Sequence, residues 1–172
     1  MAIYFSFAEL LDYPSHGLED CANQIARECA EARSSIEAFQ SATRGKSLGE
    51  LQEIYINAFD FRPDCTPNLG YHLFGDDGRR GLFLAELKGR MEACGIVLGS
   101  ELPDYLSIIL RYIDRVEEER IPLIEDCIQP GLARMTEILD ATENPYRHAI
   151  HALLSFLEHE AKSREGVEAA RV

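Results

Sequence analysis

The sequence lacks any apolar run long enough to cross a membrane. A spanning helix needs about 20 consecutive, mostly apolar residues, and charged residues interrupt every apolar stretch of this chain well before that length. The first residues also lack the basic segment and following cleavage site of a secretory signal. We therefore expect a cytoplasmic protein that does not insert into a membrane.

Basic residues are few. The chain has 17 Lys and Arg against 30 Asp and Glu, which gives a formal net charge of −13. Such a charge repels phosphate backbones and anionic lipid headgroups, and it favours basic partners. We therefore expect no binding to nucleic acid.

Cysteines are present without a pattern. The five cysteines are an odd number and include no Cys-x-x-Cys spacing, so the sequence predicts neither a disulfide framework nor a zinc knuckle. We expect reduced thiols, most of them packed in the interior.

Motifs of known catalytic sites are missing as well. No histidine follows a glutamate by three residues, which a di-iron helical bundle would need. Gly45-Lys46-Ser47 imitates the end of a phosphate-binding loop, but Gln40 stands where that loop has glycine and no strand precedes it. The sequence therefore shows no residue set on which catalysis could rest, and we expect no enzymatic activity.

One metal hypothesis remains open at this stage. His148 and His151 lie three residues apart in a helical segment and, with His159, could hold a metal ion in a metal-dependent enzyme. Histidines in such places are more commonly surface or partly packed residues. Bound metal in the purified protein would favour the enzyme hypothesis.

Helical periodicity dominates what is there. Apolar residues from Leu18 to Phe39 recur at alternating steps of four and three, which predicts one helix with a buried stripe. A shorter helix ends before Pro14, and Gly95 is expected to cap the helix that contains Phe83 and Met91. No sustained two-residue alternation predicts a strand. We expect an all-α fold, a single-domain bundle of about eight helices over residues 1–161, with a frayed tail over 162–172.

The same reasoning places the later helices. Ser47 and Glu50 form a capping box that starts a helix. The nearly all-apolar segment after Pro103 is predicted to be the central helix. Pro122 and Pro130 are expected to delimit a short helix, and Asn144-Pro145 starts the last one.

A long connection from Phe59 to Gly81 interrupts these helices. Helix connections in bundles usually have about 2–8 residues, so a longer one with many aromatic side chains is expected to have a function. Its apolar side chains either pack into the core or line a binding groove. We predict that Tyr71, Leu73 and Phe74 form an apolar floor together with Tyr105.

Acidic side chains border this predicted groove. Glu101 and Asp104 flank Pro103 at a helix start, where simple capping is the alternative explanation. With Asp76 and Asp77 they would form an anionic edge. An apolar floor with an anionic edge fits a basic amphipathic helix.

Three motifs carry a resemblance that covers most of the chain. They are Tyr55–Phe61 (Tyr-Ile-Asn-Ala-Phe-Asp-Phe), Leu69–Gly81 (Leu-Gly-Tyr-His-Leu-Phe-Gly-Asp-Asp-Gly-Arg-Arg-Gly) and Glu101–Leu106 (Glu-Leu-Pro-Asp-Tyr-Leu). Together they resemble the nitrate reductase molybdenum cofactor assembly chaperones, the NarJ or delta-subunit family within the TorD and DmsD-like group. Leu102 and Tyr105 replace the proline and histidine of the TorD and DmsD branch, which favours the nitrate reductase branch.

The resemblance implies a cytoplasmic, all-α chaperone without a cofactor. Such a chaperone binds the N-terminal peptide of an apo molybdoenzyme catalytic subunit and supports insertion of the molybdenum cofactor and complex assembly. The motifs and the predicted groove together assign peptide binding to Tyr71, Leu73, Phe74, Asp76, Glu101, Pro103, Asp104 and Tyr105. The sequence leaves open whether cofactor-synthesis proteins bind directly and whether the protein is a monomer or a dimer. A permanent structural subunit of a membrane reductase is a further alternative.

Overall fold

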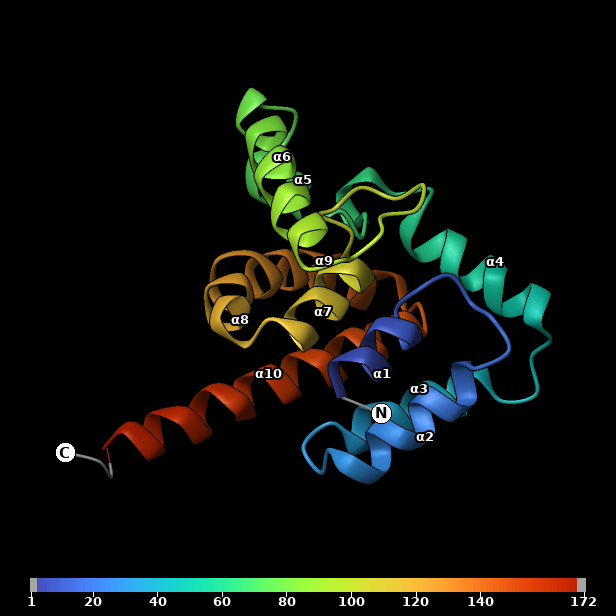
Figure 1. The fold of residues 1–172 in the computed structure, drawn as a ribbon. Coiled ribbons are helices and arrows are strands. Elements are labelled where there is room, and N and C mark those ends of the chain that lie inside the picture. Colours follow the sequence, from blue (N-terminus) through green and yellow to red (C-terminus); the bar gives the residue numbers. More distant parts are fainter. Residues whose placement is uncertain (1–2, 170–172) are drawn as a thin grey trace.

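The chain folds into an all-α bundle (Figure 1). The computed structural model describes residues 3–169, with side chains through residue 163. Within that range it contains one isolated β-bridge and no strand. The helices are α1 (Ile3–Leu10), α2 (Leu18–Glu28), α3 (Arg33–Thr43), α4 (Leu48–Phe59), the 3-10 helix η1 (Pro63–Cys65), α5 (Leu69–Phe74), α6 (Gly78–Ala93), α7 (Leu106–Arg115), α8 (Glu117–Leu123), the π-helix η2 (Ile124–Ile128), α9 (Gln129–Thr142) and α10 (Tyr146–Ala169).

Helix α7 lies at the centre, as its apolar sequence predicts. It packs against α1, and its buried residues occupy most of its turns. Helix α10 packs against α3 and α9, and its aromatic residue Tyr146 contacts Phe39, Tyr55 and Phe59 edge-on. In Figure 1 the α2–α3 pair and the α5–α6 pair stand on opposite sides of this central layer.

The predicted helix termini are confirmed where the sequence carries a capping residue. The hydroxyl of Ser47 accepts from the backbone N–H of Glu50, whose carboxylate accepts in turn from the N–H of Ser47. Asn144 accepts from the N–H of Tyr146 at 2.9 Å. Gly95 has a φ of +71°, the left-handed conformation that ends α6.

One predicted helix is two helices. The stripe from Leu18 to Phe39 is buried as expected, but the chain turns between Cys29 and Ala32, so α2 and α3 pack against each other. Cys29 is extended, with φ −117° and ψ 99°. The turn contains no Gly or Pro, and each half is amphipathic by itself. The apolar residues keep the same spacing on both sides of the break between α2 and α3, so the sequence pattern does not reveal the break.

The connection after α4 is more helical than predicted. It contains η1 and α5, and α6 begins within it at Gly78. A six-residue helix is too short to show helical periodicity, which explains the wrong prediction of a long irregular loop. Leu69 is fully buried, Tyr71, Leu73 and Phe74 are half-buried, and Phe61 is exposed.

The two prolines near the end of the bundle do not delimit a separate helix. Pro122 lies inside α8, and Pro130 lies in the first turn of α9. Between them the chain continues as η2, in which the N–H of Gln129 donates to the carbonyl of Ile124 five residues earlier, so the helix is continuous up to Pro130. The predicted tail over 162–172 is helical to Ala169, and its last three residues lie outside the described range; its fraying stays a prediction.

Candidate functional site

Two segments that the sequence analysis assigned to one site meet in the structure. The backbone N–H of Leu69 donates to the carbonyl of Asp104, and the N–H of Leu106 donates to the carbonyl of Pro67, both at 2.9 Å. These bonds form an antiparallel bridge between Asn68 and Tyr105. The bridge fixes the start of α5 beside the start of α7.

Asp104, which the sequence analysis placed on an exposed acidic edge, is buried inside the protein. Its side chain is fully buried, and Oδ2 accepts from Nε and Nη2 of Arg80 at 3.2 and 3.0 Å. Oδ1 accepts from Nδ2 of Asn68 at 3.0 Å. The carboxylate is thus neutralised internally, and the prediction that Asp104 belongs to an exposed acidic edge is wrong. Local sequence suggested an exposed helix-start charge, because its counter-ion lies 24 residues away.

The two arginines that begin α6 cover the aromatic rings of α5. The guanidinium of Arg80 lies 5.7 Å from the ring centroid of Tyr71, and that of Arg79 lies 5.9 Å from that of Phe74. Phe74 also packs against Phe83, with centroids 5.5 Å apart. The rings of α5 therefore serve mainly to attach α6, and only their outer parts reach solvent.

The acidic residues between α5 and α6 differ in their roles. Asp77 caps α6 by accepting from the N–H of Arg79 at 2.9 Å, and it pairs with the Arg79 side chain at 3.0 Å. Both bonds hold the pKa of Asp77 below its ordinary value, and the bond from the backbone N–H of Arg79 has the larger effect. Asp76 is exposed.

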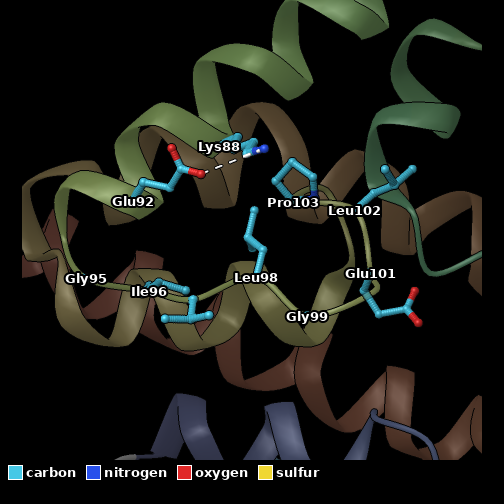
Figure 2. Close-up of a pocket in the computed structure, with 10 residues that line it drawn as sticks. Lys88, Glu92, Gly95, Ile96, Leu98, Gly99, Glu101, Leu102 and Pro103 are labelled. Carbon is cyan, nitrogen blue, oxygen red and sulfur yellow. Dashed lines mark ion pairs between the residues drawn. The ribbon is translucent and has the colours of Figure 1, made fainter.

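A groove opens between the end of α6 and the segment that leads to α7. We call it the loop groove; it has a volume of about 460 Å³. Figure 2 shows the side chain of Leu98 pointing toward Pro103. The ion pair between Lys88 and Glu92 of α6 lies across the groove from Leu98. Its lining is Lys88, Glu92, Gly95, Ile96, Val97, Leu98, Gly99, Glu101, Leu102 and Pro103. This surface is largely apolar.

A second cavity of about 460 Å³ lies on the other side of Glu101, and we call it the tyrosine pocket. The hydroxyls of Tyr55 and Tyr105 are hydrogen-bonded to each other, and Tyr13, 46% exposed, contacts Tyr55 edge-on. The lining is Tyr13, Tyr55, Phe59, Asp60, Pro63, Thr66, Pro67, Asn68, Glu101 and Tyr105. Glu101 therefore borders both cavities, and Figure 2 shows its carboxylate turned away from Leu98.

The tyrosine pocket is electrically negative. Partial burial raises the pKa of Asp60. Burial raises the pKa of Tyr105 to about 12, with further contributions from the charges of Asp12, Glu101 and Asp60, while its bond to Tyr55 opposes the shift. A group that loses a proton here would add to an existing negative potential.

The predicted site residues thus divide into three sets. Glu101 and Pro103 line the loop groove, and Glu101 and Tyr105 line the tyrosine pocket. Asp104 is an internal ion-pair partner. Tyr71, Leu73 and Phe74 of α5, and Asp76 after them, contribute to neither lining.

Sequence reasoning missed most of the residues that line the two cavities, among them Phe59, Asp60 and Tyr13. Phe59 and Asp60 end α4 one turn after Tyr55, inside a motif that had been noted without a binding role. The spacing of four residues between Tyr55 and Phe59 was the available signal. Tyr13 follows α1 in a turn, where no periodicity marks it.

The histidine hypothesis finds no support in the structure. His151 bonds through Nε2 to the carboxylate of Asp140 at 2.9 and 3.1 Å. Burial and the neighbouring charge of Arg147 lower the pKa of His148. Across the described part of the chain, no three His, Cys, Asp or Glu side chains gather as a metal site would require.

Comparisons with known proteins agree with the resemblance. The family model described as "Nitrate reductase delta subunit" matches residues 22–163. A similar protein from Bacillus subtilis (strain 168), named "Probable nitrate reductase molybdenum cofactor assembly chaperone NarJ", is 28% identical over 164 residues, which cover 95% of this chain and 85% of that protein. Among the described residues, no helix is long and apolar enough to span a membrane.

Proposed function

Because the chain belongs to the nitrate reductase delta subunit family, we propose that it is a chaperone dedicated to one molybdoenzyme, a nitrate reductase or a relative. In this role it binds the catalytic subunit before the molybdenum cofactor is inserted, supports insertion and assembly in the cytoplasm, and catalyses no reaction itself. The observation that carries the proposal is the family match over residues 22–163, joined by the similarity to the Bacillus subtilis chaperone.

The proposed binding surface surrounds Glu101. The loop groove offers apolar side chains, among them Leu98, Leu102 and Pro103, to the apolar face of a client segment. Glu101 is exposed at the border of that groove and can attract basic side chains. An apolar groove with an acidic border suits a basic amphipathic helix. We propose that this helix is the N-terminal segment of the catalytic subunit.

Within this proposal the remaining predicted residues position the surface. The bond between Asp104 and Arg80 holds α6 against the start of α7, and Arg80 in turn lies over Tyr71. Leu73 and Phe74 pack α5 beneath α6, and Asp76 adds an exposed charge next to them. Substitutions there would change the shape of the groove rather than remove a direct contact.

The test is calorimetric titration of the purified chain with a peptide of about 30 N-terminal residues of the nitrate reductase catalytic subunit from the same organism. Saturable binding that weakens as salt is raised from low to physiological concentration is expected, because part of the attraction is between charges. A scrambled peptide of the same composition is the control. Equal heats for both peptides, or none, would contradict the proposed binding.

A second experiment separates a chaperone from a permanent subunit. The catalytic subunit is purified in its cofactor-free form and in its mature form, and each is probed for this chain. The proposal expects co-purification with the cofactor-free form alone. Stoichiometric amounts in the mature enzyme would support the structural-subunit alternative instead.

A further inference from the structure

Two acidic side chains of the tyrosine pocket have no ion-pair or hydrogen-bonding partner among the residues that the structure describes. Asp60 and Glu101 both line it. Neither carboxylate forms an ion pair or a side-chain hydrogen bond with the residues that the structure describes. Asp104, by contrast, is matched by Arg80, and Asp77 by Arg79. The two carboxylates of the pocket are therefore available to an external cation.

The remaining lining of the pocket also favours a cation. None of the described residues that line it is Lys, Arg or His. The adjacent loop groove differs, since its wall already contains Lys88, which is paired with Glu92. Aromatic rings and hydroxyl oxygens complete the pocket: Tyr13 is exposed at its border, and Tyr55 contacts Phe59 with centroids 4.8 Å apart. Aromatic faces attract cations in addition to carboxylates.

The chain already contains one site of this composition. The guanidinium of Arg80 lies over the ring of Tyr71 and donates two hydrogen bonds to the carboxylate of Asp104. The tyrosine pocket presents the same kinds of groups, a tyrosine ring and carboxylates, but without the arginine. A planar guanidinium can stack on a ring and bond to carboxylates at the same time, which an ammonium group does less well.

We propose that the tyrosine pocket binds one arginine side chain of the client polypeptide, with its guanidinium between Asp60 and Glu101 and against the ring of Tyr13. This inference rests on the proposed function for the identity of the polypeptide. Glu101 borders both cavities, so a segment whose apolar face occupies the loop groove passes directly beside the pocket. The pocket then fixes the register of the segment, while the loop groove supplies its apolar contacts.

The first experiment tests the pocket without the client. Nα-acetyl-arginine amide is titrated into the full chain, and backbone amide signals are followed by NMR. Saturable shifts in the millimolar range are expected at Tyr13, Asp60 and Glu101, and they should be lost in the Asp60→Asn, Glu101→Gln double variant. Nα-acetyl-citrulline amide, which has the same shape without the charge, should cause no shifts.

A charge-matched control excludes a general effect of net charge. The Glu53→Gln, Glu137→Gln double variant removes two exposed carboxylates elsewhere on the surface. It should keep the shifts caused by the arginine probe. If the arginine probe leaves the pocket signals unchanged in the unmodified chain, or if citrulline shifts them equally, the inference is overturned.

The second experiment tests the pocket with the client. Peptides of the catalytic subunit's N-terminal segment, each with one arginine replaced by glutamine, are titrated into the unmodified chain and into the pocket variant. One replacement is expected to lower the affinity for the unmodified chain about tenfold, which equals about 1.4 kcal/mol. The same replacement should have no effect on the pocket variant, because its partner carboxylates are gone.

The outcomes separate this inference from the proposed function. If the peptide binds but every arginine replacement has the same effect on both chains, the inference fails and the chaperone function stands. If the arginine probe occupies the pocket but no peptide binds, the pocket stands and the proposed client is wrong. A lysine replacement that preserves full affinity would contradict the preference for arginine.

Discussion

Arg80 and Asp104 form an ion pair in which the acidic partner is completely buried. Nη2 of Arg80 lies 3.0 Å from Oδ2 of Asp104, and the Arg80 side chain is only 19% exposed. The pair joins α6 to the residue that precedes the bridge into α7. Because Asn68 and Arg80 both donate to it, the carboxylate organises three segments of the chain.

Removing Arg80 should therefore destabilise the fold. Arg80→Ala leaves a buried carboxylate without its counter-ion, and we expect a loss of about 3 kcal/mol in the free energy of unfolding. Arg79→Ala is the matched control, since that side chain is 70% exposed and solvent screens its ion pair with Asp77. Urea denaturation of both variants measures the difference. Equal midpoints would contradict the structural role of the pair.

Gly70 should not tolerate a methyl group. A Cβ atom at this position would lie 2.7 Å from Oδ2 of Asp104 and 3.2 Å from the ring of Phe83. We expect Gly70→Ala to cost about 1–3 kcal/mol, as overpacking does in other cores. Gly89→Ala in α6 has open space around it and should stabilise the helix by about 0.5–1 kcal/mol. Thermal melts of the two variants should move in opposite directions.

Stability should depend on the protonation of His72. Burial lowers the pKa of its ring below 6.5, a shift that the 2.7 Å bond from Nε2 to the carbonyl of Thr66 opposes. The unfolded state then binds the proton more readily, so stability rises with pH between the lowered folded pKa and 6.5. Urea midpoints at several pH values should show this rise, and His72→Gln should reduce it. The His148→Gln variant is the control, because the pKa of His148 is also lowered and its contribution must be measured separately.

The loop groove should respond to a charge placed in its apolar lining. Leu102 is 44% exposed and lines the groove, whereas Leu82 is 74% exposed on α6 and does not. Leu102→Asp is expected to weaken binding of the N-terminal client peptide about tenfold, because an apolar contact is replaced by a solvated carboxylate. Leu82→Asp should leave the affinity unchanged. Comparable losses in both variants would indicate a nonspecific effect of charge.

One thiol should react before the others. Cys94 is exposed, while the other four cysteines are buried, and burial raises the pKa of Cys29, Cys65 and Cys127 to about 12. A thiol-specific chromogenic disulfide reagent should therefore titrate one group rapidly in the native protein and five after denaturation. Cys94→Ser should abolish the rapid phase. A rapid phase of several thiols would contradict the packing of the core.

Much of the fold could be predicted because local signals mark it. The capping box at Ser47 and the glycine at position 95 predicted helix ends from the residue types alone. The nearly all-apolar sequence of α7 predicted its central position. The break at Cys29 could not be predicted, since the apolar spacing continues through it. Helix α5 was missed because six residues show too little periodicity.

The site was predictable only in part, for a different reason. Sequence analysis assigned the connection around Tyr71 and the helix start at Glu101 to one site, and the backbone bonds from Leu69 to Asp104 and from Leu106 to Pro67 bring these two segments together. Burial of Asp104 depends on Arg80, a partner distant in the chain. The tyrosine pocket depends on Tyr13 and Asp60 meeting Glu101 from separate elements. Such pairings arise from tertiary packing, which no local pattern records.

The antiparallel bridge between Asn68 and Tyr105 has a consequence for how this chain can vary. It brings the two ends of the segment between them together, so that α5 and α6 form a closed excursion from the bundle. The entropy of closing such an excursion depends only weakly on its length. Insertions or deletions in the turn after α6 should therefore alter the reach of the excursion while the helices below keep their arrangement.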